Sequence, residues 1–249
     1  MAKKIWIITL FPDYFRPLME LGVVSKVFQE KIDLRLVQLR DFSFDNYQSV
    51  DDAPFGGGPG MILRPDVLQN ALVNGVIIPG NYGEDYKNKL QVVCCDPRGK
   101  TWGQKLAKEF VDNYFNRDEK KDLLFICGRY EGIDQRFIDR YVDQLISVGD
   151  YVLSGGEIAV MAILDSTLRL LKGTLGNDQS IHDESFENDL LEYSQYTRPQ
   201  EFEGVKVPEI LLSGHHAKIK EHQKKESQRA TQEKRPDLYK IFRNNEGGS

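Results

Sequence analysis

Two glycine-containing blocks limit what this chain can fold into more than any other feature of the sequence. The first block is GRYEGID at residues 128–134, and the second is ISVGDYVLSGGE at residues 146–157. Each follows a short apolar segment, at residues 123–127 and 145–148, so both are predicted to be loops at the ends of buried strands. Open α/β sheets bind ligands at such loops. Glycine there lets the backbone approach a flat ligand closely, and neighbouring polar side chains can orient it.

Hydrophobic periodicity in the rest of the chain predicts strands that alternate with helices. Strands are predicted at residues 4–10, 32–39 and 91–95, and helices within 12–29, over 157–171 and, opened by a capping box of Thr101 and Gln104, after the third strand. Because strands and helices alternate, the expected fold class is α/β with a mainly parallel sheet.

Composition excludes several classes of protein. The chain has 249 residues, of which 40% are hydrophobic, so it can bury a substantial core. It contains no apolar run of the roughly 18 residues that a membrane span needs, and its first residues lack the apolar core of a signal peptide, so we expect a cytoplasmic protein. The three cysteines have no CxxC spacing and are expected to be buried in strands rather than to form disulfides or a zinc site.

A third glycine cluster, GGGPG at residues 56–60, does not match a known nucleotide-binding loop. It lacks the Gly-Lys-Ser/Thr ending of a P-loop, and no GxGxxG follows the first strand. Two interpretations stay open: a tightly turned loop, or a mobile lid over a ligand, with Asp51, Asp52 and Phe55 beside it.

The C-terminal part of the chain differs in character from the rest. Residues 176–196 are polar and acidic and are predicted to be a linker, and a small domain is expected from about residue 198. Residues 218–235 contain seven Lys or Arg against three Glu, a local charge of +4, whereas the whole chain carries −5. A phosphate-contacting helix and an ordinary solvated helix face both fit this pattern, and charge alone favours the second.

Six blocks, in this order, resemble the bacterial tRNA (guanine-N1)-methyltransferases of the TrmD family. They are ITLFPDYF, DDAPFGGGPGMILRP, CGRYEGIDQR, SVGDYVLSGGE, YTRP and VPEILLSGHHAKI. The resemblance runs from Lys4 to about Leu238, and the combination of blocks is specific although each glycine cluster alone would be a weak signal.

The resemblance implies a fold, a reaction and partners. It implies a SPOUT-type parallel sheet with a deep trefoil knot over residues 1–172, a linker over 173–197, and a small, mainly helical tRNA-binding domain over 198–249. The implied reaction transfers a methyl group from S-adenosylmethionine to N1 of the guanine 3′ to the anticodon, tRNA position 37. The implied partners are the anticodon stem-loop and a second copy of the chain, with the active site shared between the two subunits; neither a membrane nor DNA is expected as a partner.

The resemblance also implies a cofactor site on three loops. S-adenosylmethionine would be surrounded by Cys94, Cys95, Pro97, Gly128, Tyr130, Ser147, Val148, Gly149, Tyr151, Leu153, Gly155 and Gly156. Core packing is an alternative role for Tyr151 and Leu153. Dependence on Mg²⁺ is a further possibility that the family resemblance alone suggests, and the sequence presents no cluster of metal ligands.

The chemistry of the implied reaction requires a base, because guanine N1 carries a proton at neutral pH. The resemblance assigns this base to the linker, where Glu184 stands in place of the usual aspartate; Asp183 is the second candidate and His182 the third. It assigns to Arg169 the stabilisation of negative charge that develops at guanine O6, and to Glu131 a hydrogen bond to the Watson–Crick edge.

The resemblance turns the basic segment into a predicted RNA-binding helix. The expected phosphate or RNA contacts are Lys218, Lys220, Lys224, Lys225, Arg229 and His215, with His216 as a further cap or RNA contact. Two other functions stay open: a related SPOUT enzyme with a different target, and a non-catalytic RNA-binding protein that keeps the pocket as a ligand sensor.

Overall fold

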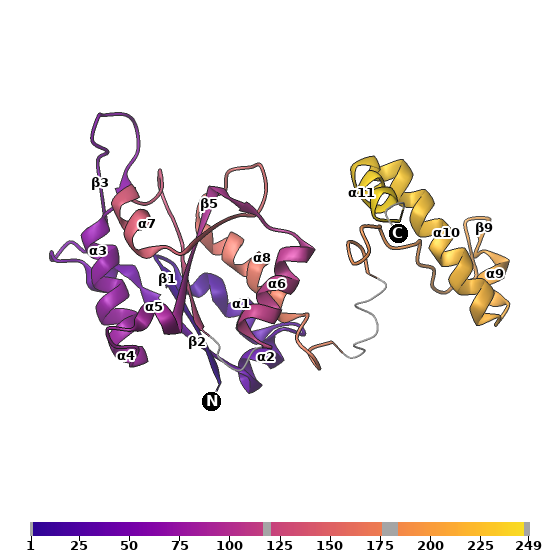
Figure 1. Ribbon diagram of the computed structural model, residues 1–249, viewed down its shortest axis with the longest axis horizontal. Helices are drawn as coiled ribbons and strands as arrows, with labels where there is room; N and C mark the ends of the chain where they lie inside the picture. Colours follow the sequence, from indigo (N-terminus) through magenta and orange to yellow (C-terminus); the bar gives the residue numbers. More distant parts are fainter. Residues whose placement is uncertain (1, 117–120, 176–183, 247–249) are drawn as a thin grey trace. The chain divides into compact units, whose positions relative to one another are not determined.

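The computed structural model describes residues 2–116, 121–175 and 184–246. The chain divides into two compact units, Met1–Gly176 and Asn177–Ser249 (Figure 1). No helix in the described ranges is both long and apolar enough to cross a membrane.

The first unit is built on a five-stranded sheet in the order β2-β1-β6-β5-β7, in which all neighbouring strands run parallel. These strands are β1 (Lys3–Thr9), β2 (Ile32–Gln38), β5 (Leu90–Thr101), β6 (Asp122–Ile126) and β7 (Gln144–Ser147). The prediction of a mainly parallel α/β sheet is therefore confirmed. Because the strands are parallel, the loops that follow β5, β6 and β7 lie at one edge of the sheet, where both glycine blocks are found.

Helices cover both faces of this sheet (Figure 1). The first unit contains the helices η1 (Pro12–Phe15), α1 (Arg16–Glu20), α2 (Ser25–Glu30), η2 (Leu39–Phe42), α3 (Pro65–Asn70), the π-helix η3 (Ala71–Ile77), α4 (Ile78–Gly80), α5 (Tyr86–Lys89), α6 (Gln104–Tyr114), α7 (Gln135–Tyr141) and α8 (Gly156–Leu168), together with the two-residue strands β3 (Asp51–Asp52) and β4 (Ile62–Leu63).

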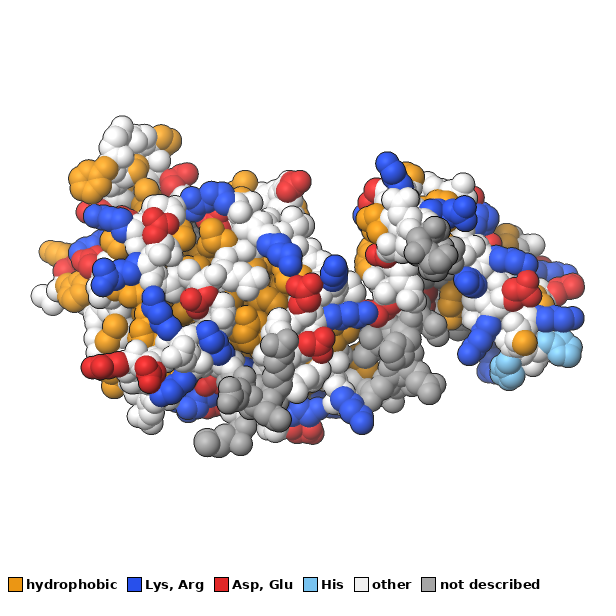
Figure 2. Space-filling view, viewed as in Figure 1, with side chains coloured by type: hydrophobic (Ala, Val, Ile, Leu, Met, Phe, Trp, Pro, Cys, Tyr) orange, Lys and Arg blue, Asp and Glu red, His pale blue; other side chains and the backbone are white. Residues whose placement is uncertain are grey.

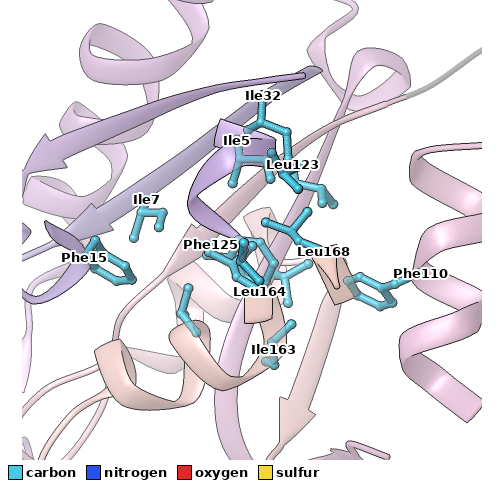
Figure 3. Close-up of a cluster of buried hydrophobic side chains, with 14 of the residues drawn as sticks. Ile5, Ile7, Phe15, Ile32, Phe110, Leu123, Phe125, Ile163, Leu164 and Leu168 are labelled. Atoms are coloured by element: carbon cyan, nitrogen blue, oxygen red, sulfur yellow. The ribbon is translucent and has the colours of Figure 1, made fainter. Parts of the chain in front are cut away.

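The alternation of side chains along β1 divides the core into two layers. Ile5 and Ile7 point to one face, where α2, α6 and α8 supply the packing partners (Figure 3). Trp6 and Ile8 point to the other face, against α3, η3 and α7. Because both faces are covered, β1 reads as a continuous apolar run, which is typical of a parallel sheet.

Strand β5 is interrupted by a bulge that matters for the site. Its pairing with β7 shifts register between Cys95 and Lys100, so that both Cys95 and Lys100 pair with Ile146. A Cβ on Gly99 would lie 2.3 Å from the backbone nitrogen of Ile146, so only glycine permits this close approach. The bulge takes Asp96 and Pro97 out of the pairing with β7, and both line cavities.

Two local predictions are wrong. The helix expected within residues 12–29 is broken into η1, α1 and α2, because the chain turns between α1 and α2 at Gly22, whose φ is +76°. The capping box is also wrong: Thr101 ends β5, and α6 starts after Gly103, with no side-chain cap.

The second unit combines a small hairpin with helices. It contains β8 (Glu201–Phe202), β9 (Val205–Lys206), α9 (Glu209–Leu212), α10 (His216–Lys234) and α11 (Pro236–Glu246). Part of the segment expected to be a linker packs within this unit. The backbone nitrogen of Leu191 donates to Thr231 Oγ1 at 2.8 Å, and Asn245 donates to Asp189 at 3.0 Å.

Candidate active site

A cavity of about 240 Å³ lies at the carboxyl edge of the sheet, between the loops that follow β5, β6 and β7. All twelve residues that the sequence assigned to the cofactor line it, together with Glu131. The remaining lining residues are Asp96, Arg129, Gly132, Ile133, Ile146, Val152, Ser154 and Ala159. The fold thus brings together residues that are more than 60 positions apart in the sequence, from Cys94 to Ala159.

The loop after β6 is held in an unusual conformation. Tyr130 has φ of +58°, a left-handed value that non-glycine residues seldom adopt. Backbone hydrogen bonds hold the turn in place: Glu131 donates to Met61 at 2.9 Å, and Gly132 donates to Arg129 at 3.0 Å. These bonds fix Tyr130 and Glu131 on the cavity wall, and backbone strain of this kind often accompanies a binding site.

Two glycines at the start of α8, its N-cap Gly155 and its first residue Gly156, are required by close packing. A Cβ on Gly155 would lie 2.2 Å from Nε of Arg129, and one on Gly156 would lie 2.9 Å from the Cα of Cys127. The nitrogen of Gly156 donates to the carbonyl of Gly128 at 2.9 Å. The second and third loops of the cavity therefore touch through their backbones, which a larger residue would prevent.

A buried carboxylate behind the cavity wall joins three segments. Glu157, which is fully buried, accepts hydrogen bonds from Thr9 Oγ1 at 2.7 Å and from Arg129 Nε at 3.0 Å. Arg129 also donates to the carbonyl of Ser154 at 3.0 Å, and its guanidinium lies 4.5 Å from the ring centre of Phe11. The end of β1, the loop after β6 and the start of α8 are thereby tied together.

Sequence reasoning did not single out Thr9 or Arg129, and named Glu157 only as the end of a block and the first residue of a predicted helix. A usable signal was present, because Glu157 lies in the first turn of a largely apolar helix and a buried carboxylate needs a cationic or hydrogen-bonding partner. Nothing in the spacing identified which arginine would be that partner.

Two of the three cysteines lie in a strand, as expected, and the third directly follows one. Cys94 and Cys95 belong to β5, and Cys127 follows β6; Cys94 and Cys127 are buried, and Cys95 is half-buried. Burial raises the pKa of the Cys95 thiol to about 12, and it raises the pKa values of Cys94 and Cys127 as well. All three thiols are therefore protonated and weakly nucleophilic at neutral pH.

Comparison with known proteins identifies the family. The model of the family described as "tRNA (Guanine-1)-methyltransferase TrmD" matches residues 3–241. The chain belongs to the TrmD family. It is 45% identical over 238 residues to the tRNA (guanine-N(1)-)-methyltransferase of Cupriavidus necator, covering 95% of this chain and 88% of that one. It is 43% identical to the enzyme of the same name from Clostridium botulinum, over 95% of this chain and 92% of that one. It is 45% identical to the enzyme of that name from Lactobacillus johnsonii, over 94% of this chain and 90% of that one.

The residues expected to act on the target base are distributed over both units of this TrmD-family chain. Glu131 lines the cavity, whereas Arg169 follows α8 and is not part of the cavity lining. Glu184 belongs to the second unit, where it lines a separate cavity of about 450 Å³ with Lys220 and Lys224. Asp183 and His182 lie outside the described residues.

The predicted basic helix is α10, which carries all the expected RNA contacts except His215, its N-cap residue. Lys and Arg side chains are numerous on this unit, with histidines near α9 (Figure 2). Two of the cations are paired: Arg229 bonds to Glu226 and Glu233 at 3.0 and 3.1 Å, and Lys225 bonds to Glu221 at 2.6 Å. Among the described residues of α10, Lys218, Lys220 and Lys224 form no ion pair.

A metal centre has no support in the described ranges. Within them, no group of three or more His, Cys, Asp or Glu side chains is arranged to hold a metal ion. The acidic side chains Asp96 and Asp134 beside the cavity are each bound by an arginine, Arg98 and Arg136.

Proposed function

We propose that this chain, as a tRNA (guanine-N1)-methyltransferase, takes its methyl group from S-adenosylmethionine bound in the cavity at the carboxyl edge of the sheet. The acceptor is N1 of the guanine immediately 3′ to the anticodon, position 37. The observation that supports the proposal most strongly is the convergence of all twelve expected cofactor residues, with Glu131, on one cavity in a chain of this family.

The lining of the cavity suits this cofactor. Five of its residues are glycines, Gly128, Gly132, Gly149, Gly155 and Gly156, so backbone groups are accessible to the adenine and methionine portions. S-adenosylmethionine supplies a methyl group that is already activated by its sulfonium. The residues of the chain have to orient the cofactor without attacking its methyl group themselves. Cys94 and Cys95 line the cavity, but their thiols are protonated and therefore do not compete with the guanine as nucleophiles.

The acceptor nitrogen has to lose a proton before it can attack. Glu184 is our proposed general base, since its carboxylate can accept the N1 proton as the methyl is transferred. Its side chain is one methylene longer than the aspartate usual in the family, so Asp183 in a shifted register is the alternative and His182 the third choice.

Two further residues complete the proposed chemistry. As the N1 proton leaves, negative charge develops toward guanine O6, and Arg169 would stabilise that charge by a charge-assisted hydrogen bond. Glu131, on the cavity wall, would accept a hydrogen bond from the Watson–Crick edge and so orient the base.

The proposal includes the organisation expected for the family. The region 1–172 forms the SPOUT methyltransferase domain with its trefoil knot, residues 173–197 are the linker, and residues 198–249 bind the anticodon stem-loop with α10 as the main contact. Two copies of the chain share each active site, and the enzyme works in the cytoplasm, where its tRNA substrate is. Mg²⁺ dependence forms no step of the proposal, because the described residues offer no metal-binding cluster.

The deciding experiment measures transfer of labelled methyl from S-adenosylmethionine to an unmodified tRNA that carries guanine after the anticodon. Wild type is compared with Glu184→Gln and Asp183→Asn, and with Glu187→Gln as a matched control in the same segment. We expect product at guanine N1, and a fall in kcat of about 10²- to 10⁴-fold in Glu184→Gln alone.

Each other outcome has a definite meaning. Loss confined to Asp183→Asn keeps the function and moves the base by one residue. Methylation mapped to another nucleotide favours a related SPOUT enzyme with a different target. Binding of cofactor and tRNA by the wild type without any transfer would leave a non-catalytic RNA-binding protein as the function.

A further inference from the structure

Residues 184–192 of the second unit, which the sequence assigned to a linker, form a closed loop. The backbone nitrogen of Phe186 donates to the carbonyl of Leu190 at 2.7 Å. The backbone nitrogen of Glu192 donates to Ser185 Oγ at 2.9 Å. The loop is therefore closed by hydrogen bonds at two places, and one of them is made by the residue that directly follows the proposed base.

The shape of this loop depends on the structure around it. Phe186 and Asp189 have φ values of +75° and +57°, which non-glycine residues seldom adopt and which persist only where neighbouring structure holds them. Helix α11 supplies one support. Asn245 Nδ2 donates to Asp189 at 3.0 Å, and Phe242, which is 9% exposed, lines a cavity together with Leu190. The second unit, rather than the loop alone, determines the conformation.

Helix α10 supplies the other support through two hydroxyl groups. The backbone nitrogen of Leu191 donates to Thr231 Oγ1 at 2.8 Å, and Ser227 Oγ donates to the carbonyl of Leu191. Thr231 is fully buried, and its hydroxyl donates in turn to the carbonyl of Ser227 at 2.7 Å. Both backbone groups of one loop residue are thus bound by side chains that lie one helical turn apart. A buried hydroxyl that both donates and accepts holds its partners closely and is costly to remove.

The face of α10 that holds the loop also carries lysines expected to contact RNA. Four side chains lie along this face: Lys220, Lys224, Ser227 and Thr231. They follow one another at intervals of four, three and four residues, which is the spacing of a single helix face. The first three of them line the cavity of about 450 Å³ that also contains Glu184. The proposed base and the predicted phosphate contacts are therefore attached to the same side of one helix.

We propose that Ser227 and Thr231 are positioning residues for the general base. By fixing Leu191 they hold the loop, and with it Glu184, in a set position relative to the lysines of α10. Binding of the tRNA backbone and placement of the carboxylate then occur together. The inference rests on the proposed function, in which Glu184 accepts the N1 proton. Proton transfer is sensitive to placement, since a displacement of about 1 Å can lower the rate roughly 10²-fold.

The test measures methyl transfer in single turnovers at saturating tRNA, together with the affinity for tRNA. Thr231→Val removes the buried hydroxyl with little change in volume, Ser227→Ala removes the second hydroxyl, and Thr231→Ser retains the first. Gln232→Ala is the matched control, because Gln232 is an exposed neighbour on the same helix and does not line the cavity that contains Glu184.

We expect the hydroxyls to affect the chemical step and not the binding of tRNA. The transfer rate should fall roughly 10- to 100-fold in Thr231→Val and in Ser227→Ala, whereas the Kd values for tRNA and for the cofactor stay close to those of the wild type. Thr231→Ser should recover most of the lost rate, and Gln232→Ala should transfer as fast as the wild type. Circular dichroism at the assay temperature confirms that each variant is folded; should Thr231→Val fail to fold, Ser227→Ala provides the same comparison.

A double mutant shows whether the hydroxyls act through the base. In a Glu184→Gln background, Thr231→Val or Ser227→Ala should lower the transfer rate no further, because the base whose position the hydroxyl controls is already absent. A merely structural role would lower the rate by the same factor in both backgrounds.

Three results would overturn the inference. They are an unchanged transfer rate in both hydroxyl variants, parallel losses of rate and of tRNA affinity, or factors that multiply in the Glu184→Gln background. Failure of the proposed function looks different, since the wild type would then form no methylated guanine, or Glu184→Gln alone would transfer at the wild-type rate.

Discussion

Arg129 and Glu157 form an ion pair, 3.0 Å between Nε and Oε2, in which the carboxylate side chain is 1% exposed and the guanidinium side chain 14%. The pair connects the loop after β6 to the first turn of α8, and Thr9 extends it to the end of β1. Two walls of the proposed cofactor cavity, the loop after β6 and the start of α8, are therefore held together by the Glu157 carboxylate.

Removing one partner of this pair should be severely destabilising. We expect Glu157→Gln to lower the free energy of unfolding by about 3–5 kcal/mol, because the Arg129 charge stays behind without its counterion. For a domain of this size that corresponds to a fall in Tm of roughly 6–20 °C. Differential scanning calorimetry measures the effect; a shift of under two degrees would show that Arg129 reaches solvent at little cost.

A control at the opposite end of the sheet distinguishes lost stability from a lost site. Tyr82 accepts from Trp6 at 2.8 Å and donates to Asp122 at 2.6 Å, away from the cavity lining. Tyr82→Phe should cost about 1–3 kcal/mol and leave cofactor affinity unchanged. Glu157→Gln should bind the cofactor more weakly than wild type even at temperatures where the variant is fully folded.

Gly155→Ala should damage cofactor binding through Arg129. The added Cβ would stand 2.2 Å from Nε of Arg129, so the guanidinium has to leave Glu157. The displaced Arg129 takes the cavity wall formed by the loop after β6 with it. The lost charge-assisted hydrogen bond, about 1.5–3 kcal/mol, then predicts a Kd for the cofactor that is roughly 10- to 150-fold higher. Gly103→Ala is the matched control, because nothing lies within 4 Å of its added Cβ. Equal Kd values in the two variants would contradict the prediction.

The cations of α10 should differ in their contribution to tRNA binding. Lys220→Ala should weaken binding and reduce the slope of log K against log salt by about 0.7–0.9, as expected for one lost phosphate contact. Lys225→Ala should reduce it less, since Glu221 already neutralises that ammonium group. Filter binding at four salt concentrations measures both slopes, and identical slopes would argue against this ranking.

Alkaline pH should destabilise the first unit. Burial raises the pKa of Cys95 from 9.0 to about 12, so the folded state retains a proton that the unfolded state loses. The resulting stabilisation is complete below about pH 9, the ordinary pKa of the thiol, and is lost as pH rises toward 12. Cys95→Ala should therefore flatten the decline of urea midpoints between pH 8 and 10, by up to about 1.4 kcal/mol per pH unit. An unchanged slope would mean that Cys95 ionises normally.

The parts of the fold that sequence reasoning predicted are those that depend on local hydrophobic pattern. Apolar runs located β6 and β7 and hence both cavity loops, and the apolar run from residue 157 located α8. The pattern could not show that Gly22 would break the first helical segment, because the apolar spacing continues across the turn. It also gave no indication of the π-helix η3, whose extra residue per turn leaves no strong mark in composition.

The expected cofactor residues came from family resemblance rather than from spacing. Cys94, Gly128 and Ser147 meet only because β5 lies between β6 and β7, an order that no local feature specifies. Arg129 was missed for a different reason. Its role depends on a partner, Glu157, that lies 28 positions away in the sequence.

The position of β7 at the edge of the sheet has a consequence for how the protein fluctuates. This strand has four residues and pairs on one side only, with β5, yet it carries the whole third loop of the cavity. Transient detachment of β7 would abolish the cavity while the other four strands stay paired, so we expect opening at β7 to need less free energy than global unfolding and to be suppressed by a bound ligand. Amide hydrogens of β7 should accordingly exchange with solvent much faster than those of β1 and β6, and should slow more than any others when the cofactor is added.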